Sequence, residues 1–181
     1  MSVEEKIIEF IKLQKGIKNA KISSTKITED KNKDGENLLY IRALTIEKQL
    51  GNNYSNNCVY YGFDTNGNYV GCVKISVLNI IPPTHVEMEY WASKEYRNRG
   101  NISTLAKTVI KEIFKDKVFD GLKVRDNVPI SNIETIMVDI NKDNFASLSV
   151  ARKLGFDKEG FLQKNDYYNE VENRSSLKNI L

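Results

Sequence analysis

The sequence is poor in the residues on which several common kinds of site depend. Its 181 residues include one histidine, two cysteines, three prolines and one tryptophan. A single histidine, His85, leaves almost no material for a serine–histidine relay or a histidine-rich metal centre, so we expect no metal site. Cys58 and Cys72 form no C-x-x-C pair, and two reduced thiols are typical of a cytoplasmic protein.

Long apolar segments and blocks of like charge are missing as well. The opening MSVEEKIIEF is acidic and unlike a signal peptide, and the apolar runs are too short to cross a membrane. The 27 basic and 24 acidic residues are interleaved, which disfavours a nucleic-acid-binding stripe. The length and the 40% hydrophobic content predict one domain over residues 1–181. We expect a monomer or homodimer without membrane or nucleic-acid partners.

Hydrophobic spacing assigns the elements ahead of residue 80. It predicts a helix over residues 3–13, a strand over 20–28 and a helix over 38–50 that stops at Gly51. The strongest local signal follows, where the β-rich runs NNCVYYGFD and YVGCVKISVLNI flank an Asn66-Gly67 turn. This pattern predicts a β-hairpin.

The second half of the chain alternates between strand and helix patterns. The predicted elements are a strand over 85–93, a helix over 103–117, a strand over 133–140 and a helix over 143–154. Residues 118–132 look like a linking insertion, and two last strands are predicted in KEGFLQ and KNDYYNEV. A right-handed crossover makes the strands 85–93 and 133–140 parallel. The fold class is therefore a mixed α/β sheet with helices on both faces.

A basic loop lies at the carboxyl end of the predicted strand 85–93. Ligands of such sheets bind at this end of a strand, beside helix N-termini, whose unpaired N–H groups attract phosphates. In EYRNRGNISTL, Gly100 lets the backbone approach closely, Arg97 and Arg99 add charge, and Ser103 adds a hydroxyl. Taken alone, the loop is equally well explained as a solvent-exposed basic turn.

Two segments together resemble the GNAT superfamily of acetyl-CoA-dependent N-acetyltransferases. RNRGNI is similar to the pyrophosphate loop Arg/Gln-x-x-Gly-x-Gly/Ala of that family, and INKDNFASLSVARKLGF to its second signature. VEMEYWASKEYRNRG further resembles the branch of the ribosomal-protein N-terminal alanine acetyltransferases. The resemblance extends over residues 68–160. It implies a mostly antiparallel central sheet in which one parallel strand pair splays apart to admit the pantetheine arm.

The resemblance also implies which residues hold the cofactor. Backbone groups of residues 91–93 would hold the arm and the acetyl group, amides of 98–103 would cradle the pyrophosphate, and two asparagines would fix the second junction. The residues implied in acetyl-CoA binding are Trp91, Ala92, Ser93, Arg97, Asn98, Arg99, Gly100, Asn101, Ile102, Ser103, Asn141 and Asn144. Ile102 departs from the family pattern, which prefers Gly or Ala there.

Acetyl transfer needs a group that accepts the proton of the amine and one that protonates the thiolate. Strand parity puts Glu87 and Glu89 on one face, roughly 6–7 Å apart. Glu87 matches a glutamate of the resembling branch and is our candidate base, although the pair could equally serve to attract a cationic substrate. Ser147 matches the serine proposed as thiolate partner in that branch, and it is equally well explained as a helix serine that faces the ligand without proton transfer. Ala151 stands where many relatives carry a tyrosine acid.

The implied function is N-acetyltransfer from acetyl-CoA to a primary amine by direct attack on the thioester. The acceptor would be a protein or peptide N-terminus or a small amine. The alternative is a GNAT-like module that binds CoA without catalysis. The departures from the family pattern at Ile102 and Ala151 are the features that support it. A site for another anion, including nucleic-acid phosphate, is a weaker third hypothesis.

Overall fold

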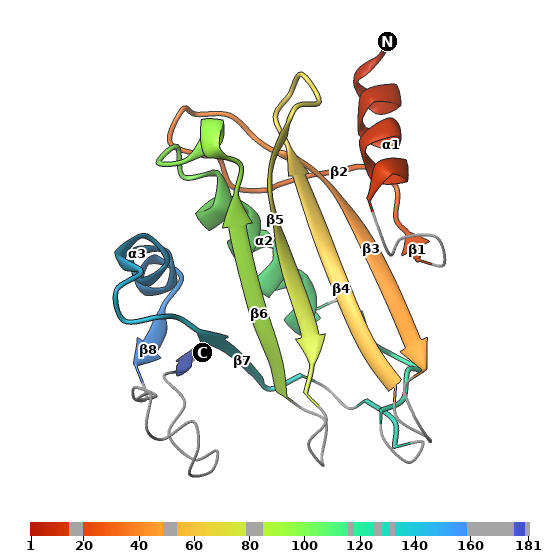
Figure 1. The fold of residues 1–181 in the computed structure, drawn as a ribbon, viewed down its shortest axis with the longest axis vertical. Coiled ribbons are helices and arrows are strands. Elements are labelled where there is room, and N and C mark those ends of the chain that lie inside the picture. Colours follow the sequence, from red (N-terminus) through yellow and green to blue (C-terminus); the bar gives the residue numbers. More distant parts are fainter. Residues whose placement is uncertain are drawn as a thin grey trace.

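One sheet forms the centre of the computed structural model (Figure 1). The structure describes residues 1–14, 20–48, 54–78, 85–115, 118–124, 128–130, 133–158 and 176–179. The strands lie in the order β1-β3-β4-β5-β6-β7-β9-β8, and β2 also pairs with β3. They are β1 (Lys21–Ile22), β2 (Lys26–Ile27), β3 (Leu39–Lys48), β4 (Tyr54–Phe63), β5 (Tyr69–Val77), β6 (His85–Ala92), β7 (Thr135–Asp139), β8 (Phe156–Lys158) and β9 (Ser176–Asn179). Of the described pairings only β6–β7 is parallel.

Helices cover both faces of this sheet. They are α1 (Val3–Leu13), α2 (Asn101–Lys115) and α3 (Phe145–Lys153), with a short 3-10 turn η1 (Lys94–Tyr96) before α2. Helix α1 packs on Ile41 and Phe63, whereas α2 packs on Tyr40 and Tyr60 of the same strands. Because neighbouring residues of a strand point to opposite faces, the two helices lie on opposite sides. The predicted mixed α/β class, with helices on both faces, is confirmed.

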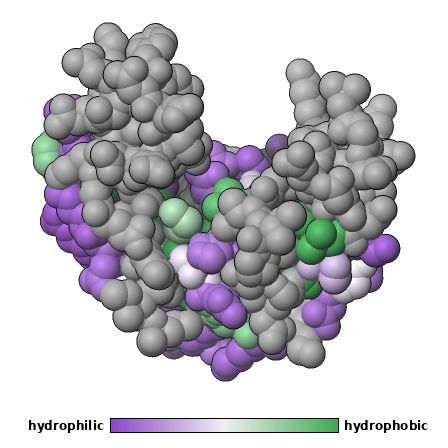
Figure 2. Space-filling view, turned by 90° about the horizontal axis from the view of Figure 1, so that it is seen from below, coloured by the Kyte–Doolittle hydropathy of each residue, from purple (hydrophilic) through white to green (hydrophobic). Residues whose placement is uncertain are grey.

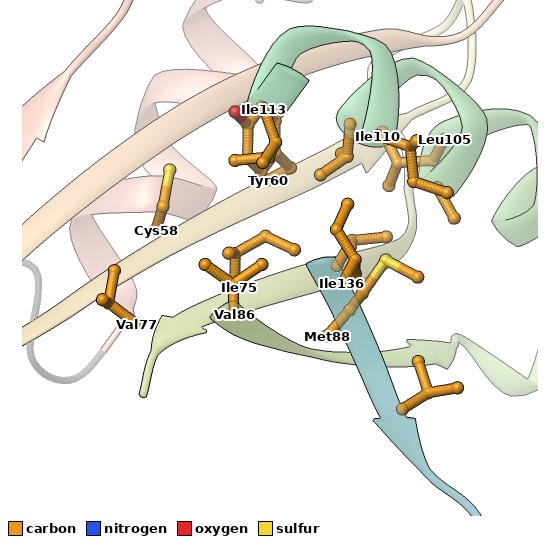
Figure 3. Packing of buried hydrophobic residues seen from close by; sticks show 14 of the residues in the cluster. Cys58, Tyr60, Ile75, Val77, Val86, Met88, Leu105, Ile110, Ile113 and Ile136 are labelled. Carbon is orange, nitrogen blue, oxygen red and sulfur yellow. The ribbon is translucent and has the colours of Figure 1, made fainter. Parts of the chain in front are cut away.

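The larger core lies between the sheet and α2. Figure 3 shows Leu105, Ile110 and Ile113 of α2 pointing towards side chains of β4, β5, β6 and β7, among them Tyr60 and Ile75. Cys58 is also buried there, and both cysteines are buried and free, as expected of core residues. The C-terminal helix α3 joins the same core through Ala151.

The predicted helix over residues 38–50 is wrong, because Leu39–Lys48 is strand β3. Its ten residues pair with β4 over the whole length, and β1 and β2 pair with its other edge. Tyr40 and Ile41 are both buried, but in different cores on opposite faces of the sheet. Burial of consecutive residues on alternating faces is typical of a strand that is covered on both sides. An apolar run of this kind does not separate a helix from a strand by periodicity alone.

The other main elements are where the sequence predicted them. The hairpin β4–β5 turns at Gly67 with a φ of 81°, and β6, α2, β7 and α3 follow in the expected order. The predicted strand over 20–28 is present as the short β1 and β2. KNDYYNEV and most of KEGFLQ lie outside the described residues, and β9 was not predicted. Within the predicted insertion 118–132, an isolated bridge joins Lys123 and Pro129.

The parallel pair separates after three residue pairs. His85, Val86 and Glu87 face residues 135–137 of β7, and the described β7 then continues along β9. Among the described strands, the rest of β6 is paired with β5 alone. Figure 1 shows α3 beside the upper part of β6, where the two strands have diverged. The splayed pair that the family resemblance implied is therefore present.

The opposite end of the sheet is the one at which β6 begins. Figure 2 views the molecule from that end, and the described surface there is mostly hydrophilic with apolar side chains in small separate areas. None of the described helices is long and apolar enough to cross a membrane.

Candidate acetyl-CoA site

A groove of about 540 Å³ opens where β6 leaves β7. One wall is the end of β6, the floor is the loop and first turn of α2, and the other wall is α3. The lining residues are Lys33, Tyr90, Trp91, Ala92, Tyr96, Arg97, Asn98, Gly100, Asn101, Ile102, Ser103, Asn144, Ala146, Ser147, Ser149, Val150 and Lys153. Among these described residues Lys33, Arg97 and Lys153 are cationic and none is acidic, so the groove favours an anion.

The loop before α2 has the backbone of an anion cradle. Asn98 and Gly100 have φ angles of 61° and 78°, and Asn98 is the one described non-glycine residue with positive φ. The Thr104 N–H donates to the Gly100 carbonyl at 3.0 Å, which begins the helical hydrogen bonding. The amides of residues 101–103 precede that bond and have no intrahelical acceptor. The helix dipole adds partial positive charge at the same place.

Ile102 fits this loop because residue 71, on the neighbouring strand β5, is a glycine. Ile102 is 7% exposed and lines the groove. A Cβ on Gly71 would lie 2.5 Å from Ile102 Cδ1 and 2.5 Å from the Trp91 carbonyl oxygen. The space that the bulkier side chain needs is thus provided by a residue with no side chain. The departure from the family pattern has a local compensation.

The two arginines of the loop lie on different sides. Arg97 lines the groove, whereas Arg99 lines a separate polar cavity of about 160 Å³ with Asp34, Glu36 and Asp64. The Arg99 guanidinium lies over the Tyr96 ring, 5.5 Å from its centre. The structure therefore brings Arg97 to the predicted ligand position and does not bring Arg99 there.

The remaining predicted binding residues divide in the same way. Trp91, Ala92 and the residues at 98 and 100–103 line the groove, and so does Asn144, which also caps α3 by accepting from the Ser147 N–H at 3.2 Å. Ser93 and Asn141 do not line it. Asn141 instead accepts from the Asp143 N–H at 2.9 Å and shapes the turn before α3. The binding roles of all these residues stay predictions.

The candidate catalytic residues are not side by side. Ser147 lines the groove, and its carbonyl accepts a hydrogen bond of 2.8 Å from the Tyr90 hydroxyl, whose pKa is raised by burial. Glu87 is half-buried on β6 and lies outside the groove. Glu89 is exposed, and its carboxylate accepts from Lys74 Nζ at 2.7 Å. Parity is as predicted, since Val86 and Met88 face the core and the two glutamates face away.

Several lining residues were missed by the sequence reading. Those on α3, residues 146, 149, 150 and 153, recur at helical spacing and share one face with the groove. That spacing was available in the sequence. Lys33 had no such signal, because it comes from a loop that precedes the recognisable motifs. Within the described residues, no three His, Cys, Asp or Glu side chains are grouped as ligands of a metal ion.

A known protein family matches most of the chain. Residues 25–157 match the family described as acetyltransferase (GNAT) domain. No curated protein matches the chain. In three dimensions it is similar to the ribosomal-protein-S5-alanine acetyltransferase of Vibrio fischeri, at 23% identity and a TM-score of 0.50, with 67% of this chain and 59% of that one covered.

Two further solved structures are similar in fold. The microcin C7 self-immunity acetyltransferase MccE, in complex with acetyl-CoA and AMP, is 17% identical with a TM-score of 0.50, covering 69% of this chain and 61% of that one. The spermidine N-acetyltransferase of Vibrio cholerae, in complex with CoA and spermine, is 18% identical with a TM-score of 0.47, covering 67% and 62%. The chain thus spans about six tenths of the length of these structures. The family match extends over most of the chain, and this protein belongs to the GNAT acetyltransferase family.

Proposed function

We propose that this protein is an N-acetyltransferase that uses acetyl-CoA to acetylate a primary amine. The observation that carries the proposal is the groove at the splayed strands, which combines free strand edge, helix N-terminus and cationic side chains. Acetyl-CoA carries groups that suit such a groove: an arm with amide groups, a pyrophosphate and an acyl group activated as a thioester. The structure of MccE, which contains acetyl-CoA, shares the fold.

The arm and the phosphates would be bound by different parts of the groove. The backbone of Trp91 and Ala92, free of β7 on that side, can hydrogen-bond the amides of the arm as an added strand would. The amides of residues 98–103 and the guanidinium of Arg97 would hold the pyrophosphate. Asn144 would contact the arm from the start of α3 while it keeps its capping bond.

The proton of the amine would leave towards β6. Glu87 lies four residues before Trp91, roughly 13 Å along the strand, so it would accept this proton through water rather than directly. Glu89 lies closer to Trp91 and forms an ion pair with Lys74, but Glu87 is the residue that matches the glutamate of the resembling branch. On the other side of the reacting bond, Ser147, which lines the groove, would donate a proton towards the thiolate when the carbon–sulfur bond breaks and the amide forms.

The acceptor is proposed as a protein or peptide N-terminus, with small amines as the competing class. The sequence resemblance to the ribosomal-protein alanine acetyltransferases supports it, and the similarity in fold to the Vibrio fischeri ribosomal-protein acetyltransferase is in line with it. The predicted cytoplasmic location and the monomeric or homodimeric state belong to the same proposal.

The test measures acetyl-CoA binding and thiol release with a panel of alanine- and serine-starting peptides, an amino acid and a polyamine. We expect tight binding and turnover with at least one peptide. Glu87→Gln should lower kcat by about 100-fold and leave the Kd of acetyl-CoA unchanged, with loss of the acidic limb of the pH–rate profile. Glu89→Gln is the matched control. If it loses turnover while Glu87→Gln keeps it, the base assignment is wrong.

The alternative of a CoA-binding module without catalysis keeps one structural argument. Ala151, at the position of the acid tyrosine in many relatives, is completely buried in the core. An alanine side chain carries no proton donor, so this position cannot supply the acid. Binding of acetyl-CoA with no thiol release for any amine of the panel would select this alternative over the enzyme.

A further inference from the structure

A loop from the N-terminal part of the chain lies directly on the phosphate end of the groove. We name it the strap, residues 29–37, between β2 and β3. Two hydrogen bonds connect backbone groups of the strap to the loop before α2 and to the first turn of α2. The Lys33 N–H donates to the Arg99 carbonyl at 3.0 Å, and the Thr104 hydroxyl donates to the Lys31 carbonyl at 3.2 Å. The strap is thereby fastened to both ends of the loop-to-helix junction.

Side-chain contacts also fasten the strap to α2. The Asn32 amide donates to Asn101 Oδ1 at 2.8 Å, and Asn101 is 2% exposed. Lys107 and Lys111 reach Asp30 at 3.3 and 3.1 Å. Together these contacts hold the strap against the loop before α2 and against the helix itself, which gives the strap a defined position relative to the groove.

Lys33 is the residue of the strap that enters the groove lining. Its Nζ donates at 3.1 Å to the carbonyl of Asn98, a residue of the cradle loop. An ammonium group has three donors, so this bond leaves two for a ligand. A Cβ on Gly100 would lie 3.0 Å from Lys33 Cγ, so the lysine stem and the glycine backbone are in close contact.

Lys33 also supplies the positive charge that the sequence analysis expected from Arg99. The loop motif supplies two cations, but Arg99 turns to the neighbouring cavity with its three carboxylates, and Arg97 alone remains in the groove. Lys33 restores the second positive charge at this end of the groove from a different part of the chain. Lys153 is on α3, at the far wall.

We propose that Lys33 is a pyrophosphate-binding residue and that the strap forms part of the cofactor site. This inference rests on the proposed use of acetyl-CoA, and it adds a cofactor-binding residue that lies outside the family motifs. The diphosphate is favoured over the 3′-phosphate because Lys33 is bonded to the cradle loop itself. A charge-assisted bond of this kind contributes about tenfold in affinity.

The experiment compares the Kd of CoA and of 3′-dephospho-CoA for the full chain and for Lys33→Met, by calorimetry at two salt concentrations. We expect about tenfold weaker binding of both ligands and a smaller salt dependence in the variant. Lys31→Met is the matched control, since this exposed strap lysine does not line the groove, and it should bind as the unsubstituted protein does. Lys33→Arg should recover most of the affinity.

Each outcome separates this inference from the proposed function. If the unsubstituted protein binds neither ligand, the proposed function itself fails. If it binds CoA and Lys33→Met binds equally well, the inference about Lys33 is overturned while the function stands. A loss for CoA alone would overturn the assignment to the diphosphate, and an equal loss in Lys31→Met would show general electrostatic attraction instead of contact. Melting temperatures equal to that of the unsubstituted protein show that the variants remain folded.

Discussion

Strands β3 and β4 are paired over ten residues each, whereas β6 and β7 are paired over three. The first region, β3 to β5, has helix α1 on one face and α2 on the other, and its backbone groups are used by the sheet. The second region, β6 with β7 and α3, leaves part of the β6 edge without a described strand partner and forms a groove there. Both belong to one sheet.

The difference lies in where unpaired backbone groups are permitted. Buried N–H and C=O groups are costly without partners, so the first region closes its ladders. In the second region the free strand edge and the first amides of α2 face a groove, where a ligand or water can satisfy them. We therefore expect substitutions in the first region to change stability, and those in the second to change cofactor binding.

The substitution Gly71→Ala should lower the stability of the protein and also weaken cofactor binding, because Gly71 lies at the boundary of the two regions. The new Cβ would meet Ile102 and the Trp91 carbonyl, and the φ of 152° adds strain. We expect a loss of about 3 kcal/mol in the free energy of unfolding, together with much weaker CoA binding. Urea unfolding and calorimetry measure the two effects.

The control for this substitution is Gly121→Ala, at which φ is +76° and nothing lies within 4 Å of the added Cβ. It should cost only about 1 kcal/mol and leave binding intact. Ile102→Ala in the Gly71→Ala background should recover part of the stability. Equal effects of the two glycine substitutions would refute the proposed contact with Ile102.

Glu112→Gln should weaken the first region alone. This buried carboxylate of α2 accepts from Lys26 Nζ at 2.8 Å and from the Tyr40 hydroxyl at 2.7 Å. Burial opposes its ionisation, but these partners outweigh burial, and the pKa of Glu112 is lowered from its ordinary 4.5. We expect a loss of about 2 kcal/mol at pH 7 with no change in the Kd of CoA.

The pH dependence of this effect has a definite sign. Because the pKa of Glu112 is lower in the folded state, its stabilisation is present above pH 4.5 and is lost as the pH falls below it. The gap between the two proteins should therefore narrow in urea melts at pH 4 and below. Glu9→Gln, at an exposed position on α1, should leave the free energy of unfolding nearly unchanged at both pH values.

Arg97→Met should weaken cofactor binding in the second region without changing the stability of the protein. The guanidinium lines the groove from an exposed position, so we expect about tenfold weaker CoA binding and an unchanged melting temperature. Arg99→Met is the matched variant, and because Arg99 lines the other cavity its affinity should change by less than about threefold. Equal losses in affinity would mean that Arg99 turns into the groove when the ligand binds.

Tyr90→Phe should have the smallest effect and the most diagnostic one. The Tyr90 hydroxyl donates across the splay to the Ser147 carbonyl at 2.8 Å, which links β6 to α3. Its loss leaves a part-buried acceptor without that donor, at a cost of about 1 kcal/mol in stability. If the bond also fixes the width of the groove, the KM for acetyl-CoA rises while kcat is kept. An unchanged KM would limit the bond to a role in stability.

The strand and the loop at the groove were predictable because each has a local signal, whereas the splay of the strand pair was implied only by the family resemblance. The strand pattern of residues 85–93, the loop around Gly100 and the Asn144 cap all depend on residues close in sequence. The helix predicted over residues 38–50 failed for the complementary reason. Tyr40 and Ile41 are buried on opposite faces, and only the partners on both sides of β3 distinguish this pattern from that of a buried helix.

The motifs of the sequence resembled the family to which the chain belongs. The sequence by itself also determined the order of the elements from β4 to α3 and the end of the sheet at which the groove lies. Those features follow from backbone preferences and spacing, which act over a few residues. The tertiary structure decided which cations reach the groove, because that depends on residues brought together from far apart. Arg99 is turned towards the carboxylates of the strap and the hairpin, and Lys33 lies in the groove because the strap is fastened to α2.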